Sequence, residues 1–324
     1  MFFCYGMQTM KSYICIIAKT KKMSEQSLAI GGQAVIEGVL MRNKDQIAIA
    51  VRNEKGKIIL KTETIESVTK KYPFLGWPFL RGIIAFFQMM IIGIKALMYS
   101  TNIAMGEKEE QLNAWEIAGL IGTSLVFSIA IFVLAPYILT HFVGFDERTS
   151  PVFFNLIDGA IKMLLFVIYV AAIGYMEDIR RVFQYHGAEH KAVNCYEAGK
   201  ELTIKNVKEF STIHPRCGTS FIMFVMIVGI FILSLIAPLT SAVVPAFSGF
   251  PFFVQKSILF LLRIVFLLPI ASVSYEVLKL AGKYRTNKVL QLVNSPGMLI
   301  QKLTTKEPDE RMIEVAIKSL KAVV

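Results

Sequence analysis

The chain has 324 residues, of which 54% are hydrophobic and 18% charged, and it carries 35 Lys and Arg against 24 Asp and Glu. Soluble domains contain about 45–50% apolar residues and interrupt their apolar runs with charges, whereas two long runs here, 117–140 and 219–255, contain no charged residue. This composition excludes an ordinary soluble domain and predicts a mainly α-helical, multi-pass membrane protein with a small cytoplasmic α+β unit.

The first 22 residues are expected to be an upstream extension. The Lys residues of this stretch follow its apolar start, which is the reverse of the order in a secretory signal peptide. Met23 opens a polar stretch and is the expected start. Cys195 and Cys217 then remain as the relevant cysteines. Both lie in a segment predicted to be cytoplasmic, where thiols stay reduced, so buried or ligand roles are expected.

Residues 23–81 are predicted to form a β-rich cytoplasmic segment. β-branched residues are frequent in 46–52 and 57–64, on either side of a Gly-containing turn. This pattern indicates a β-hairpin, and 33–41 is expected to add a third strand. Glu37 is the one acid among the apolar residues of that third strand. An exposed edge position is the favoured interpretation, and a role in substrate binding is the alternative.

Residues 82–116 are predicted to form an amphipathic or re-entrant helix followed by a turn. The stretch 82–105 is long enough to cross a bilayer, which requires about 20 mostly apolar residues, although it contains Gln88 and Lys95. A crossing here would export residues 1–81 with their 13 Lys and Arg. Because basic residues are retained on the cytoplasmic side, we expect this helix to lie at the inner membrane surface.

Four transmembrane helices are predicted, two within 117–175 and two within 219–278. The segments 1–81, 176–218 and 279–324 hold 13, 7 and 9 of the 35 Lys and Arg. Four crossings place these three segments, and with them both termini, in the cytoplasm. The net charge of +11 is then explained by contact with anionic membrane lipids. It does not indicate nucleic-acid binding.

Charged residues also fall inside the predicted spans. Asp158 and Lys162 are four residues apart on one helix and are expected to pair. Arg263 lies near the middle of its span. Ionised side chains are costly in lipid and usually face the interior of a helix bundle, so we expect Arg263 to approach Asp158. Independent snorkelling of the cations is the alternative.

The cytoplasmic segment 176–218 carries the candidate chemistry. Its apolar periodicity predicts a helix that ends near residue 199. His186 and His190 are four apart and therefore lie on one face of that helix. His214 and Cys217 are separated by two residues, a spacing that lets a turn present two ligands. Together they form a tetrahedral N/S set that suits a divalent metal, Zn²⁺ best.

Glu189 completes an H-x-x-E-H pattern, the order of inverzincins, in which the Glu is the general base. The pattern alone also arises by chance on surface helices, and the nearby H-x-x-C is what favours a metal. Four protein ligands would give a closed structural site, and three would leave a position open for catalysis. Whether Cys217 or Glu197 also binds the metal decides between these two arrangements, and the sequence leaves both open.

The C-terminal segment 279–324 is predicted to be helical. Apolar residues recur on one face of 309–322. This amphipathic helix is expected to pack on the rest of the cytoplasmic unit, and partner binding is the alternative.

Four segments, 32–42, 185–191, 214–221 and 304–308, resemble those of the bacterial YqhQ family. The resemblance extends from about Leu28 to the C-terminus. That family is a domain of unknown function labelled a predicted metal-dependent enzyme. The resemblance implies a multi-pass protein of a bacterial plasma membrane.

Two hypotheses of function follow. The first is a membrane-embedded metal-dependent enzyme, a hydrolase acting at the inner leaflet, with Arg216 and Arg42 holding an anionic group such as a lipid phosphate. Its metal ligands would be His186, His190 and His214, with Cys217 as a further ligand, and Glu189 would be its base. The second is a non-enzymatic scaffold or transport component with a structural metal site or none.

Overall fold

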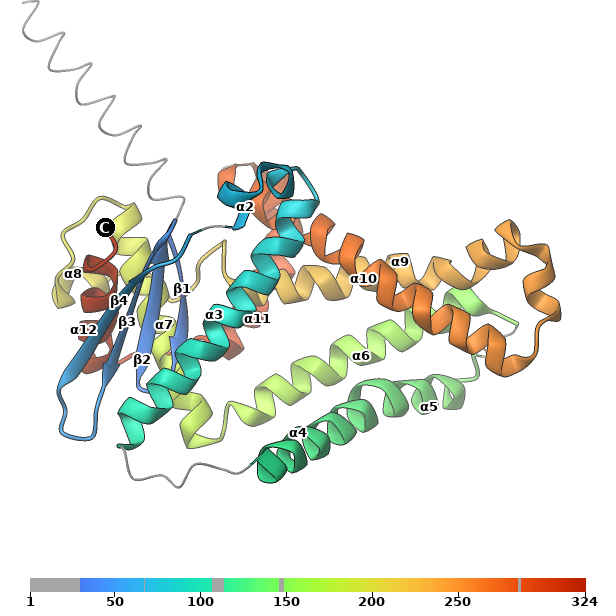
Figure 1. Cartoon of the computed structure of the whole chain (residues 1–324), viewed down its shortest axis with the longest axis horizontal. Coiled ribbons are helices and arrows are strands. Elements are labelled where there is room, and N and C mark those ends of the chain that lie inside the picture. The colour runs from blue at the N-terminus through green and yellow to red at the C-terminus, as the bar shows by residue number, and fades with distance from the viewer. Residues whose placement is uncertain (1–29, 67, 107–113, 146–148, 285–286) are drawn as a thin grey trace, which may run out of the picture.

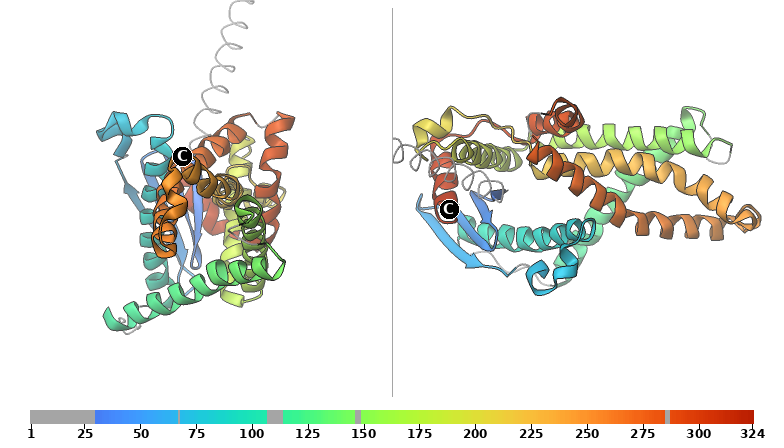
Figure 2. Two further views of the ribbon diagram at one scale, coloured as in Figure 1. Left: turned by 90° about the vertical axis from the view of Figure 1, so that its right-hand side faces the viewer. Right: turned by 90° about the horizontal axis from the view of Figure 1, so that it is seen from above.

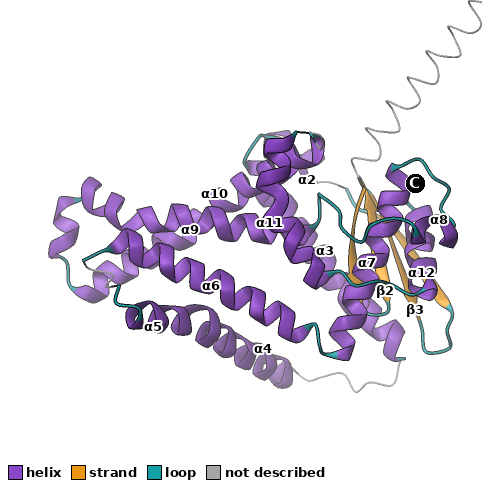
Figure 3. Ribbon diagram, turned by 180° about the vertical axis from the view of Figure 1, so that it is seen from behind, coloured by secondary structure: helices purple, strands orange, loops and turns teal. Residues whose placement is uncertain are grey.

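The computed structural model describes residues 30–66, 68–106, 114–145, 149–284 and 287–324. The expected extension 1–22 and the expected start at Met23 lie outside these residues. The described chain is mainly helical, and its one sheet lies at one end of the molecule (Figure 3).

The sheet is a four-stranded antiparallel meander. Its strands are β1 (Ile30–Val35), β2 (Gly38–Asn43), β3 (Gln46–Arg52) and β4 (Ile58–Thr64), paired in chain order. The predicted hairpin is confirmed as β3 and β4. The prediction of one strand over 33–41 is wrong, because the chain reverses at Glu37. This residue has a φ of +50°, and Val35 pairs with Gly38 across the turn.

Each face of the sheet is covered by helices (Figure 1). Side chains alternate between the two faces along each strand. Val39 and Met41 point to one face, which packs on α7 (Glu177–Glu197), α8 (Ile204–Lys208) and α12 (Glu310–Lys321). Leu40 points to the other face, which packs on α3 (Leu80–Met105) through Ile92 and Ala96. The sheet is therefore the middle layer of an α/β/α sandwich.

Five helices are long and apolar enough to cross a membrane, where four crossings were predicted. Besides α3, they are the continuous helix of α4 (Ala114–Ile129), a π-helical turn (Ala130–Leu134) and α5 (Ala135–Phe142), together with α6 (Pro151–Ile173), α9 (Gly218–Val243) and α10 (Phe252–Lys283). The additional helix is α3. It runs obliquely along the sheet, while the other four extend away from the sheet as a bundle (Figures 1 and 2).

The C-terminal segment connects the bundle to the sandwich. Helix α11 (Lys288–Thr304) packs on α9, and the following residues cross α7, where Lys306 N donates to Phe183 O at 2.9 Å. Asp309 then caps α12 by accepting from Met312 N at 2.8 Å. The apolar face of α12 is fully buried against the sheet, which confirms the predicted amphipathic helix. The short elements are α2 (Val68–Lys71), η1 (Pro73–Gly76) and η3 (Pro245–Gly249).

Candidate metal centre

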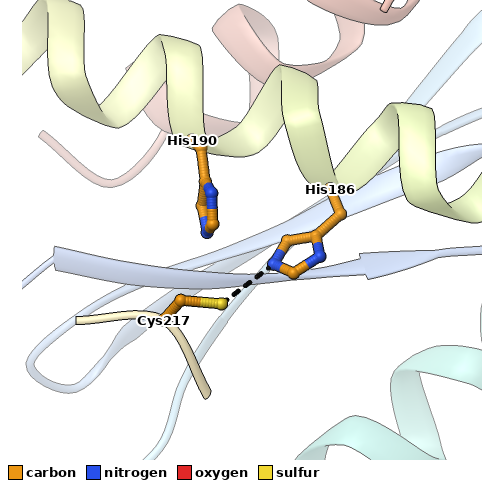
Figure 4. A group of neighbouring side chains, drawn as sticks. All are labelled: His186, His190 and Cys217. Atoms are coloured by element: carbon orange, nitrogen blue, oxygen red, sulfur yellow. Dashed lines mark hydrogen bonds between the residues drawn. The ribbon is translucent and has the colours of Figure 1, made fainter. Parts of the chain in front are cut away.

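Three potential ligands from two elements meet beside the sheet. His186 and His190 project from one face of α7, and Cys217 is the N-cap residue of α9 (Figure 4). One ligand atom from each residue lies within 4.8 Å of the other two. His186 Nε2 lies 3.2 Å from Cys217 Sγ. The helix and the turn before α9 thus converge.

Backbone carbonyls determine the tautomers of both α7 histidines. His186 Nδ1 lies 2.9 Å from Thr304 O, and His190 Nδ1 lies 2.5 Å from Thr212 O. A carbonyl oxygen can only accept a hydrogen bond, so each Nδ1 carries the hydrogen. In the neutral rings both Nε2 atoms therefore present a lone pair. Metal-binding histidines are oriented in this way by their second nitrogen.

The donor set fits a zinc ion. Zn–N bonds of ~2.0–2.1 Å and Zn–S bonds of ~2.3 Å place tetrahedral ligand atoms roughly 3.4–3.6 Å apart. The observed separations, from 3.2 Å to at most 4.8 Å, need only small side-chain adjustments to reach these values. Cys217 Sγ also accepts from Thr219 N at 3.4 Å. Two imidazoles with one thiolate are a ligand set that suits Zn²⁺.

A buried carboxylate lies next to these ligands. Glu189 is 6% exposed, and its Oε2 is 4.0 Å from Nε2 of both His186 and His190. The Gly32 N–H of β1 donates to this carboxylate. Burial raises the pKa of Glu189 to about 7, although His186 and the Gly32 hydrogen bond act in the opposite direction. The carboxylate would therefore lie within reach of a water molecule bound to an ion at these ligands.

Gly32 is expected to be essential for the position of Glu189. A Cβ at residue 32 would lie 2.7 Å from Leu40 O and 2.8 Å from Glu189 Oε1. We expect Gly32→Ala to destabilise the protein by about 1–3 kcal/mol and to lower its metal affinity. Gly31→Ala is the matched control, because a Cβ there meets nothing within 4 Å. Thermal unfolding and metal titration of both purified variants measure the difference, and equal behaviour would contradict the packing of β1 on Glu189.

His214 lies beside the cluster of three ligands but is not part of it. Its Nε2 is 3.3 Å from Glu197 Oε2, and its Nδ1 accepts from Arg216 N at 3.3 Å. Its ring centroid is 5.7 Å from that of His190. Burial lowers the pKa of His214 to about 4, so the ring is neutral near pH 7. With both nitrogens engaged elsewhere, His214 is placed as a support for the turn before α9.

Arg216 and Glu197 form a partly buried ion pair next to His214. Arg216 Nη2 contacts Glu197 Oε1 and donates to Ile30 O at 3.2 Å. Glu197 thereby contacts both His214 and Arg216. Of the two residues that sequence analysis left open, Cys217 joins the ligand cluster and Glu197 does not. Arg216 is held by protein groups of β1 and α7.

Arg42 and Glu37 lie away from the ligand cluster. Gly32, which faces Glu189, pairs with Met41, so the next residue, Arg42, points to the opposite face of the sheet. There Arg42 Nη1 donates to Met89 Sδ of α3 at 3.1 Å. Glu37 accepts two hydrogen bonds from Arg181 of α7, at 2.5 and 2.6 Å. This ion pair connects the β1–β2 turn to α7.

Several groups that support the site were not predicted from the sequence. Gln301, fully buried on α11, accepts from His214 N at 2.9 Å and donates to His214 O at 3.0 Å. Thr212 and Thr304 act through their carbonyl oxygens, which leave no signal in a sequence. Gly32 could have been noticed as a glycine before an apolar strand, but its partner Glu189 is 157 positions further along the chain.

The comparisons with known proteins agree with one another. A family model described as "Protein of unknown function (DUF1385)" matches residues 77–324. The chain belongs to this family. All three potential ligands and Glu189 fall within the part of the chain that the DUF1385 model matches.

The chain is also 34% identical over 310 residues to the "Uncharacterized protein YqhQ" of Bacillus subtilis (strain 168). The aligned region covers 90% of this chain and 91% of that relative. The family resemblance inferred from the sequence is therefore confirmed. No solved structure matches the chain.

Proposed function

We propose that this DUF1385 protein is a metal-dependent enzyme, a hydrolase, that works at the cytoplasmic face of a bacterial plasma membrane. The convergence of His186, His190 and Cys217 with the buried carboxylate of Glu189 carries this proposal. Three protein ligands are typical of catalytic zinc sites, whereas structural sites usually have four. The side chain of His186 is 15% exposed and that of His190 is 2% exposed, so solvent and substrate would approach from the His186 side.

Each residue has a role in this proposal. His186, His190 and Cys217 would hold a divalent metal, with Zn²⁺ favoured by the thiolate. When bound, such an ion supplies Lewis acidity and activates water near neutral pH. Glu189 accepts the proton of the attacking water and returns it to the leaving group. The Gly32 N–H keeps the carboxylate in place during both transfers.

The role in anion binding that sequence analysis gave to Arg42 and Arg216 is not supported by their positions. Arg42 contacts α3 across the sheet, and Arg216 contacts Glu197. We assign both residues a structural role. The proposed substrate class is therefore a hydrolysable group at the membrane surface, with no phosphate selectivity assigned to these two arginines.

The sandwich supports a topology of four crossings. Strands β1–β4 pack on α7 and α12, so the strands, α7 and α12 share one side of the membrane. The number of crossings between β4 and α7 must then be even, and three candidate spans lie between them. The α4–α5 helix and α6 meet at the end of the bundle far from the sheet (Figure 1) and would cross as a pair. We therefore propose that α3 lies at the surface, and that the basic sandwich side is cytoplasmic.

The test of catalysis is Glu189→Gln. We expect the purified variant to retain its metal, because the three ligands are unchanged, and to lose activity. Bacillus subtilis lacking its YqhQ protein would be complemented with wild type or variant, and its membranes compared by untargeted mass spectrometry. His190→Ala is the metal-free control. If Glu189→Gln restores the same membrane profile as wild type while His190→Ala does not, the metal is structural and the enzyme proposal is wrong.

A further inference from the structure

A second polar site lies in the helix bundle, between α6, α9 and α10. It is a cavity of about 200 Å³. Most of its lining is apolar. Four polar side chains reach it, and they are Asn155, Asp158 and Lys162 of α6 and Arg263 of α10. None of these residues belongs to the metal centre, so the cavity requires its own explanation.

The cavity is near mid-height in the bundle. Lys162 lies eleven residues after the start of α6 at Pro151, and Arg263 eleven after the start of α10 at Phe252. Gly229 lies eleven after the start of α9, which begins at the opposite end of the bundle (Figure 1). At about 1.5 Å per residue, each is roughly 16 Å from its end. A hydrocarbon core is ~30 Å thick, so a spanning bundle would hold the cavity near the midplane.

The charges of the cavity are arranged for a ligand. The predicted pair is confirmed: Lys162 Nζ contacts Asp158 Oδ2. Arg263 Nη2 donates to Asn155 Oδ1 at 2.9 Å, which orients the guanidinium toward α6. Asp158 is only 7% exposed, and its Oδ1 accepts no hydrogen bond from any residue that the structure describes. A buried acceptor of this kind normally has a partner.

Two cations and one carboxylate therefore line the cavity, and the Oδ1 atom of that carboxylate lacks a hydrogen-bond donor among the described residues. Ionisable groups at this depth are costly and usually mark a substrate or ion site. An occupant should offer oxygens to Lys162 and Arg263 and a hydrogen to Asp158 Oδ1. We propose that the cavity binds a small oxyanion that retains a hydroxyl hydrogen, of the class of hydrogen phosphate and phosphate monoesters. Midplane sites of this type are common in transporters, and this inference goes beyond the proposed hydrolase.

Two variants separate binding from folding. Arg263→Gln removes one charge-assisted contact and should weaken binding about tenfold or more. Gly229→Leu places a side chain in the cavity, because a Cβ at 229 meets only Ile270, at an ordinary 3.9 Å. It leaves every charge unchanged. Lys256→Gln is the control, since Lys256 is a cation of the same helix that lies outside this cavity.

The experiment uses the full chain in phosphatidylcholine nanodiscs. Thermal unfolding is followed with inorganic phosphate and with sulfate at matched ionic strength, and in nanodiscs containing phosphatidic acid. Phosphate or phosphatidic acid should raise the unfolding midpoint. Sulfate has no hydroxyl hydrogen, so its affinity should be at least tenfold lower, and a correspondingly higher concentration should be needed for the same rise. A response to phosphatidic acid alone identifies a lipid source, and a response to inorganic phosphate a free anion.

Arg263→Gln and Gly229→Leu should lose the phosphate response, and Lys256→Gln should keep it. The proposal is overturned if neither phosphate probe stabilises the wild-type protein. It is also overturned if Gly229→Leu responds like wild type, because the occupied cavity could not then be the binding site.

Discussion

Replacing Cys217 or His190 by alanine is expected to reduce bound zinc from about one ion per chain to a small fraction of that. Each residue supplies one of only three ligand atoms that converge in the described part of the chain. The two remaining ligands would bind the ion too weakly to retain it during buffer exchange. Elemental analysis of the purified, detergent-solubilised protein after buffer exchange measures the stoichiometry.

His214→Gln is the matched control for this prediction. Glutamine can replace the contacts of His214 with Glu197 and Arg216, and His214 is outside the ligand cluster. We therefore expect this variant to keep its zinc. Loss of zinc in His214→Gln with full retention in Cys217→Ala would show that the ligand set is wrong.

Gly187→Ala is expected to destabilise the protein by about 3 kcal/mol or more. A Cβ at residue 187 of α7 would lie 2.0 Å from Lys306 O, a backbone atom that cannot rotate away. Helix propensity alone predicts the opposite, a gain of about 1 kcal/mol for alanine over glycine. Thermal unfolding in detergent decides the sign. Gly218→Ala is the control, because a Cβ at the start of α9 meets nothing within 4 Å.

The same substitution should weaken metal binding. The residues after α11 cross α7 at Gly187, and Thr304 O, just before this crossing, orients His186 through Nδ1. A displaced crossing would release that histidine. Zinc titration of Gly187→Ala should therefore give a lower affinity than the wild-type protein. Unchanged affinity together with a lowered unfolding midpoint would contradict this coupling.

Local periodicity predicted much of the fold. The charge-free runs predicted the long apolar helices α4–α5 and α9, and the helical period predicted that His186 and His190 lie side by side. These features depend on neighbours within a few residues, so a sequence contains them. Five helices could cross a membrane, against four predicted crossings, because α3 also has the length and composition of a span. The packing of α3 on the sheet was not predicted, because it involves residues about 50 positions away in the sequence.

The rest of the site depended on tertiary contacts. The sequence favoured His214 as a ligand and left Cys217 open, whereas the structure groups Cys217 with the α7 histidines and engages His214 with Glu197 and Gln301. The separation of Arg42 from Glu189 follows from strand alternation. It requires the turn at Glu37, whose positive φ is unusual for a glutamate and was not predicted.

X-ray absorption spectroscopy of the zinc-loaded protein tests the metal centre most directly. Two imidazole nitrogens at ~2.0–2.1 Å and one sulfur at ~2.3 Å are predicted for the wild-type protein. A shell with no sulfur in the wild-type protein, or one with three imidazoles, would contradict the centre formed by α7 and the N-terminus of α9.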